Sequence, residues 1–212
     1  MIPQTPKLIL ISLFIFISIH VYAQSPTDYI ILRKTSDTLT SDTIFGHVDL
    51  PKSGVFWNVK IKTPSGERKF KNKEVSRIKV GNLYFSSIPY GKSYAIVPRI
   101  LDGEVELYFY YTGSDRLSFI PQMQEDFNRD ISYDNHLIIS EAIWNTTSNF
   151  YIFNRNTGQY IKLTNSTDKF KDEIAEIFKS NENIYKSIKS GKYGYEQIGY
   201  IVKLYNSSIR KL

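Results

Sequence analysis

The sequence contains no cysteine among its 212 residues. This absence excludes disulfide bonds, a thiol nucleophile, thiolate metal ligands and a lipid-modified cysteine, so stability has to come from packing. There is also no Gly-x-Ser-x-Gly segment of the kind that presents a hydrolase serine. After residue 23 no run is long and apolar enough to predict a membrane-spanning helix.

The first 23 residues have the pattern of a signal peptide. Lys7 precedes an apolar run, Leu8–Val21. Ala23 is a small residue at the position where a signal peptidase would cleave. A run of this length is short for the ~20 residues that span a bilayer. We therefore expect export and cleavage after Ala23, to the periplasm, the outer-membrane periphery or the outside of the cell. An uncleaved N-terminal anchor is the alternative.

The formal net charge of +6 is unevenly distributed. Residues 52–79 contain nine basic and two acidic side chains, residues 102–141 contain two basic and nine acidic ones, and residues 179–212 are basic again. Alternating blocks favour internal charge pairing or a two-signed surface over a single phosphate-binding face. Nucleic acid is therefore not the expected partner, whereas peripheral contact with anionic envelope surfaces is compatible with the charge.

Between Asp28 and Leu163 the apolar residues mostly alternate with polar ones, which predicts half-buried strands. Asp102-Gly103 and Asn156-Thr-Gly158 are turn sequences that predict two hairpins, with Pro98 at an edge or a bulge. Residues 112–148 are acidic and without a sustained period. The sequence predicts a β-rich domain over 24–163, with an irregular acidic connection at 112–148.

From residue 164 to 212 the period changes to that of helices. Three apolar faces are expected. They comprise Phe170, Ile174, Ile177 and Phe178; Ile184 and Ile188, before a stop at Gly191; and Tyr195, Ile198, Ile201, Val202 and Tyr205. Short amphipathic helices need a surface to cover. The predicted fold class is therefore α+β: an antiparallel sheet, partly rolled or sandwich-like, capped by about three C-terminal helices.

Several segments carry a resemblance to a known group of proteins. They are "DYIILRKTSDTL", "KFKNKEVSRIKVGNLYF", "GEVELYFYY" and the tail "FKSNENIYKSIKSGKYGYEQIGYIVKLYN". Together they resemble secreted, uncharacterised proteins of Bacteroidota. The resemblance implies a secreted or envelope location and a β-rich domain followed by helices, and it implies no activity.

The stretch "GEVELYFYY" places four aromatic residues among nine. If it is a strand, Val105, Leu107, Phe109 and Tyr111 share the core face, and the opposite face carries Glu104, Glu106, Tyr108 and Tyr110. Carboxylates beside aromatic rings are one way to hold a sugar, and their spacing overlaps that of glycosidase pairs. The alternative is that the two glutamates pair with Lys or Arg on neighbouring strands.

Two further sets of residues suggest weaker candidate sites. Asp126, Asp130 and Asp134 could form an irregular calcium site, although Ile131 stands where a calcium-binding EF-hand loop needs Gly. Thr38 and Thr43 follow aspartates in short motifs that resemble acceptors of O-linked glycans in exported Bacteroidota proteins.

"SSIPYGKS" ends like a phosphate-binding loop but lacks its first Gly and precedes a predicted strand, so no nucleotide or other cofactor is expected. The leading hypothesis is an exported, non-catalytic envelope protein that acts by binding or assembly. The alternative is a glycan-binding protein or glycosidase using the Glu104/Tyr108 face, and whether the chain is an enzyme stays open.

Overall fold

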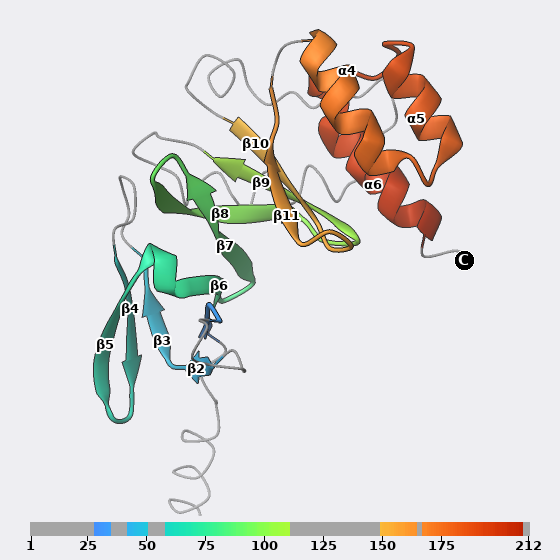
Figure 1. The fold of residues 1–212 in the computed structure, drawn as a ribbon. Coiled ribbons are helices and arrows are strands. Elements are labelled where there is room, and N and C mark those ends of the chain that lie inside the picture. The colour runs from blue at the N-terminus through green and yellow to red at the C-terminus, as the bar shows by residue number, and fades with distance from the viewer. Residues whose placement is uncertain (1–27, 35–41, 51–57, 111–148, 165–166, 210–212) are drawn as a thin grey trace, which may run out of the picture.

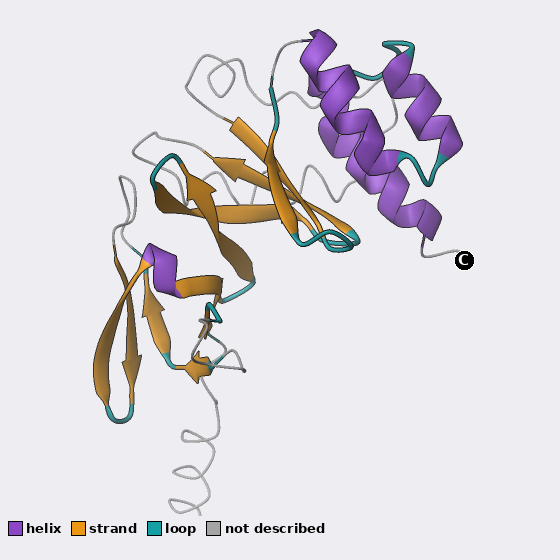
Figure 2. Ribbon diagram, in the orientation of Figure 1, coloured by secondary structure: helices purple, strands orange, loops and turns teal. Residues whose placement is uncertain are grey.

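The computed structural model describes residues 28–34, 42–50, 58–110, 149–164 and 167–209 (Figure 1). These residues form an eight-stranded sheet, a three-stranded sheet and a block of C-terminal helices. Figure 2 shows the helices gathered at one end, with the strands occupying the rest of the molecule. The expected α+β fold with a partly rolled, sandwich-like antiparallel sheet is confirmed, and the sheets do not close.

The larger sheet is antiparallel throughout, with the order β11-β10-β9-β8-β7-β6-β1-β2. Its strands are β1 (Tyr29–Leu32), β2 (Thr43–Phe45), β6 (Val75–Val80), β7 (Leu83–Tyr90), β8 (Ser93–Leu101), β9 (Val105–Tyr110), β10 (Asn149–Asn154) and β11 (Gln159–Lys162). Neighbouring strands in the order from β6 to β11 are consecutive in the chain, so this part of the sheet is a meander built from local pairings.

The smaller sheet consists of β3 (His47–Asp49), β4 (Asn58–Thr63) and β5 (Gly66–Lys71). Alternate residues of these strands, including Val48, Val59, Ile61 and Phe70, point inward. They share one buried cluster with residues of β1, β6, β7 and β8. The two sheets therefore enclose a core of their own, at the end of the molecule away from the helices (Figure 1).

Both predicted hairpins form where the turn residues indicated. Asp102-Gly103 joins β8 to β9, and Gly158 lies in the turn between β10 and β11 with a positive φ of 68°. Pro98 was expected at an edge or a bulge; it lies in β8, which is a central strand, so the edge alternative is wrong and the irregularity that follows it agrees with the bulge alternative. A shift of the β8–β9 register follows directly, between Arg99 and Leu101.

The described helical segments lie where the period predicted helices, although two short parts are 3-10 turns. They are α4 (Thr167–Ala175), the 3-10 turn η2 (Glu176–Phe178), α5 (Glu182–Lys189), the 3-10 turn η3 (Tyr195–Gln197) and α6 (Ile198–Ile209). Asn181 caps α5, because its side chain accepts a hydrogen bond from the Ile184 amide at 3.2 Å. Gly191 follows α5 with a φ of 79°, which agrees with the expected stop.

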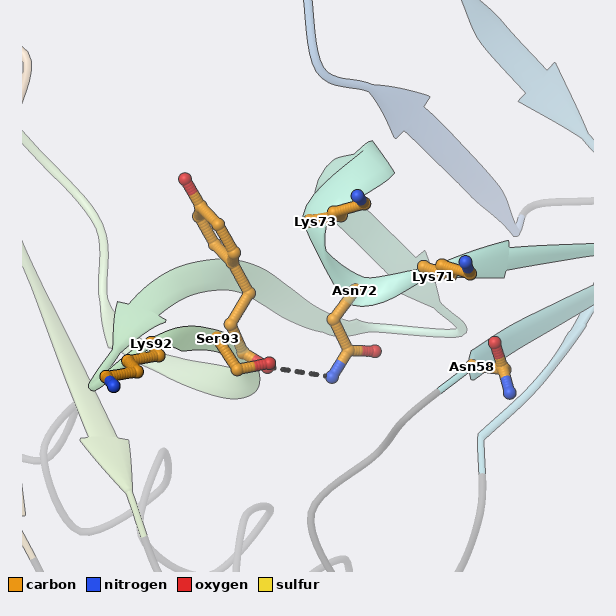
Figure 3. A pocket seen from close by; sticks show the side chains of 7 residues that line it. Asn58, Lys71, Asn72, Lys73, Lys92 and Ser93 are labelled. Carbon is orange, nitrogen blue, oxygen red and sulfur yellow. Dashed lines mark hydrogen bonds between the residues drawn. The ribbon is translucent and has the colours of Figure 1, made fainter.

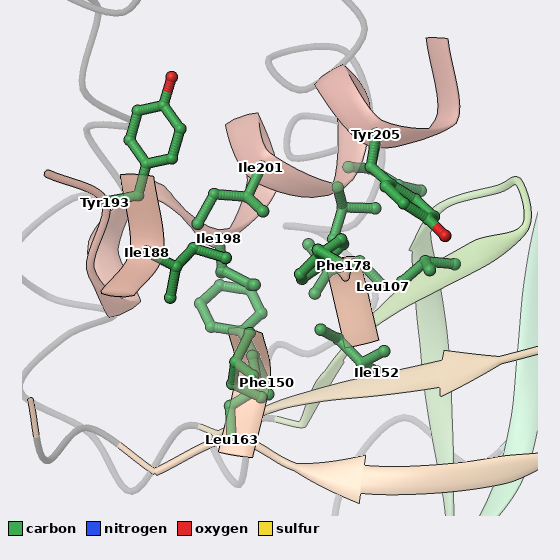
Figure 4. Close-up of a cluster of buried hydrophobic side chains, with 14 of the residues drawn as sticks. Leu107, Phe150, Ile152, Leu163, Phe178, Ile188, Tyr193, Ile198, Ile201 and Tyr205 are labelled. Atoms are coloured by element: carbon green, nitrogen blue, oxygen red, sulfur yellow. The ribbon is translucent and has the colours of Figure 1, made fainter. Parts of the chain in front are cut away.

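The helices cover one face of β8, β9 and β10 and form the larger core with it (Figure 4). The residues contributed by β9 are Val105, Leu107 and Phe109, as the alternation predicted. Phe178 and Tyr205 meet edge to face, with ring centroids 5.0 Å apart. None of the helices in the described part of the chain is long and apolar enough to cross a membrane.

A buried asparagine joins the last helix to the β8–β9 hairpin. The Asn206 side chain accepts a hydrogen bond from the Val105 amide at 3.0 Å and donates one to the Val105 carbonyl at 2.8 Å. Both backbone polar groups of Val105 thus have a hydrogen-bond partner. Val105 is the first residue of β9, next to the register shift of β8. Gly103 makes this approach possible, because a Cβ at that position would collide with the Asn206 amide.

Candidate functional site

The strand that carries the predicted sugar-binding residues is internal. All six residues of β9 are buried, since β8 and β10 flank it and the helices cover one face. On the other face Glu106, Tyr108 and Tyr110 are only 0%, 1% and 2% exposed. A stacking platform needs exposed ring surface, so the assumption that these rings are available to a ligand is wrong for the described fold.

Glu106 is surrounded by three arginines from different parts of the sheet. Its Oε1 lies 3.3 Å from Arg77 of β6, 3.6 Å from Arg99 of β8 and 2.5 Å from Arg155, which follows β10. Arg155 also reaches Asp102 at 2.7 Å, in the β8–β9 turn. Glu106 therefore does pair with arginines, which was the alternative to a sugar site, and it is the buried centre of a network whose outer members are partly exposed.

The second carboxylate oxygen of Glu106 accepts a hydrogen bond from the Tyr108 hydroxyl. That hydroxyl in turn accepts one from Ser86 Oγ on β7 at 2.9 Å. Burial raises the pKa of Tyr108 far above its ordinary value, and the nearby Tyr160 and Glu106 raise it further. The Tyr108 hydroxyl is thus held neutral and acts as a donor to the carboxylate.

The arrangement around Glu106 suits a structural junction. A glycosidase carboxyl has to face the sugar across a cleft, with a second carboxyl opposite. Glu106 instead accepts donors at both oxygens, and Glu104 is half-buried with no ion pair among the described residues. The two glutamates are not brought together around an open space, and their role in sugar binding stays a prediction.

A pocket of about 320 Å³ lies at the other core, between the two sheets (Figure 3). Its wall is formed by residues from the start of β4, the end of β5, the 3-10 turn η1 (Asn72–Glu74) and the β7–β8 hairpin. They are Asn58, Lys71, Asn72, Lys73, Lys92 and Ser93, together with Tyr94. Sequence reasoning missed this site, because its residues come from segments up to 36 positions apart.

Asn72 forms the fixed part of this pocket wall. Its side-chain nitrogen donates to the Tyr94 carbonyl at 2.9 Å, and its own carbonyl accepts from Ser87 Oγ at 2.6 Å. The side-chain oxygen of Asn72 is the only buried side-chain polar atom in the described residues without a hydrogen-bond partner. A buried acceptor without a donor costs about 1–3 kcal/mol, so the unpaired Asn72 oxygen lowers the free energy of unfolding.

The outer face of the three-stranded sheet is basic. The cationic residues that alternate with the buried ones of β4 and β5 are Lys60, Lys62, Lys69 and Lys71. Asp49 and Glu67 are the acidic residues of this face. Lys60 stands directly opposite Lys69, and Lys60 also lies 3.8 Å from Glu67. Lys71 then continues the face to the rim of the pocket.

The remaining predicted site residues have separate outcomes. Thr43 is exposed at the start of the edge strand β2, where a modifying enzyme could reach it. Thr38 and the three aspartates Asp126, Asp130 and Asp134 lie outside the described residues. Within the described ranges no group of three His, Asp or Glu side chains is placed to hold a metal ion.

The "SSIPYGKS" segment runs from β7 through a turn at Gly91 and Lys92 into β8. No helix follows the turn, so the segment does not form a phosphate-binding loop of the nucleotide-binding type. No protein-family model, no curated protein and no solved structure matches the chain.

Proposed function

We propose that this chain is an exported, non-catalytic binding protein of the cell envelope, and that it contacts an acidic glycan through the outer face of β3, β4 and β5. Export rests on the signal-peptide pattern of residues 1–23 and on the resemblance to secreted Bacteroidota proteins. Binding rests on the charge of this sheet face.

The observation that carries the proposal is the pairing of Lys60 with Lys69 across β4 and β5. Like charges directly opposite each other on a sheet destabilise it. Lys69 itself forms no ion pair with a described residue, so only the contact of Lys60 with Glu67, at 3.8 Å, offsets part of this repulsion. A side chain whose position costs stability is typical of a surface used for binding.

The chemistry of the face favours a polar polymer as the partner. Protein interfaces have an apolar centre, and helices that lie on membranes insert apolar side chains. The large exposed hydrophobic residues in the described part of the chain are Phe45, Tyr90 and Leu204, and none belongs to β3, β4 or β5. A row of ammonium groups without an apolar centre fits a chain of acidic sugars.

The test is retention of the purified protein on immobilised polygalacturonate, compared with retention on neutral dextran. We expect retention on the acidic polymer that weakens as salt approaches ~0.15 M, where the screening length is about 8 Å. The variant Lys60→Gln/Lys69→Gln should lose most of it, and Lys162→Gln, an exposed change on β11, should keep it. Equal retention on both polymers, or by all three proteins, would contradict the proposal.

A further inference from the structure

The pocket beside Asn72 has the charge of an anion site. Three of its lining residues, Lys71, Lys73 and Lys92, carry ammonium groups, and the lining includes no carboxylate. The nearest acidic residue in sequence, Glu74, is engaged by the backbone amide of Lys71 at 2.6 Å. Neither Lys71 nor Lys73 forms an ion pair with any described residue. Lys71 and Lys73 therefore bring positive charge to the pocket that no carboxylate of its lining neutralises.

The same pocket offers polar groups that suit hydroxyls. Asn58 and Ser93 lie on its rim, and Figure 3 shows Asn72 between Lys92 on one side and Lys71 and Asn58 on the other. The Asn72 side chain is oriented by its bond to the Tyr94 carbonyl, which leaves its oxygen as an acceptor without a donor. A ligand with a hydroxyl next to an anionic group complements both features of the pocket. The hydroxyl donates to the Asn72 side-chain oxygen, and the anionic group pairs with the ammonium groups.

Arg33 holds the Tyr94 side of the pocket in place. The Arg33 guanidinium lies 4.6 Å from the centre of the Tyr94 ring, and it donates hydrogen bonds to the carbonyls of Ser87 at 2.8 Å and Lys73 at 3.2 Å. Arg33 thus ties β1 to the β7–β8 hairpin and to the turn that carries Lys73. The wall that carries Lys73 is therefore already formed before a ligand binds.

We propose that this pocket binds one acidic monosaccharide unit, a sugar that carries a phosphate or a carboxylate. The anionic group is held by Lys71 and Lys73, and the hydroxyls are held by Asn72, Asn58 and Ser93. A volume of about 320 Å³ is at the lower end of the range for ligand pockets and fits a single unit. The assignment deepens the proposed function, on which it rests, because the pocket adjoins the basic sheet face.

The test follows the amide resonances of the pocket residues in the purified protein during titration with four compounds. These are glucose 6-phosphate, glucuronate, glucose and inorganic phosphate. We expect saturable shifts with the two acidic sugars, at affinities about tenfold higher than for glucose or phosphate. Glucose lacks the charge-assisted hydrogen bonds, which are roughly twice as strong as neutral ones, and phosphate lacks the hydroxyl groups. A preference between the two acidic sugars tells whether phosphate or carboxylate is the natural group, and either preference supports the proposal.

Two variants make the test specific. Lys71→Gln/Lys73→Gln should weaken binding of the acidic sugars by about tenfold, and Lys162→Gln should not change it. Absence of saturable shifts with either acidic sugar would overturn the proposal, and so would equal affinity for glucose. Equal affinity for inorganic phosphate would overturn the assignment to a sugar.

The two proposals can fail separately. Lys60→Gln/Lys69→Gln alters the sheet face but no lining residue of the pocket, so it should abolish polymer retention and leave the monosaccharide titration unchanged. Monosaccharide binding without polymer retention would reject only the sheet-face function. Polymer retention without monosaccharide binding would reject only the pocket.

Discussion

Replacing Glu106 by Gln tests whether the buried carboxylate is a structural junction. The change keeps the shape of the side chain and removes one negative charge from among Arg77, Arg99 and Arg155. Breaking a buried ion pair by removing one partner typically costs about 3–5 kcal/mol. The side chains of Arg77 and Arg155 are 38% and 41% exposed and can regain water, so we expect a smaller loss of about 2–3 kcal/mol.

The assay is equilibrium unfolding in urea. With a slope of roughly 2 kcal/mol per M, the expected loss lowers the midpoint by about 1 M. Glu104→Gln is the matched control, because Glu104 is half-buried and has no ion pair among the described residues, and its effect should stay within about 0.5 kcal/mol. The reasoning is refuted if Glu106→Gln is as stable as the unaltered protein, and a stable Glu106→Gln that loses glycan retention would make Glu106 a ligand-binding residue.

Three further predictions follow from other contacts. Lys69→Gln should raise the free energy of unfolding by about 0.5 kcal/mol by relieving repulsion with Lys60, and an unchanged urea midpoint would count against the cross-strand argument. Asn206→Ala should lower the free energy of unfolding by about 2–3 kcal/mol and speed hydrogen exchange of the Val105 amide. Slow exchange of that amide in the variant would contradict the hydrogen-bond assignment. Burial, followed by neighbouring tyrosines, raises the pKa of Tyr151 from 10.0 to about 12, so its stabilisation is complete below pH 10 and lost as the pH rises toward 12. Tyr151→Phe should therefore flatten the alkaline decline in stability, measured by thermal unfolding at several pH values.

The local features of the fold could be predicted from the sequence because they depend on neighbours in the chain. Alternation in "GEVELYFYY" assigned Val105, Leu107 and Phe109 to the core face, and Asp102-Gly103 marked the hairpin. The helix faces were identified in the same way, since a 3.6-residue period is visible in a dozen residues. The sequence left Pro98 at either an edge or a bulge, because edge and centre are decided by which other strands join the sheet.

The candidate sites were decided by tertiary structure. Alternation separates the two faces of a strand, but only the assembled fold determines that both faces of β9 are covered, which changes Glu106 from a possible ligand residue into the centre of an arginine cluster. Those arginines come from positions 77, 99 and 155, and no local pattern brings them together. The basic block at 52–79 was visible in the sequence. The register that sets Lys60 against Lys69, and the pocket that the β7–β8 hairpin forms with Lys71 and Lys73, required the strands to pair.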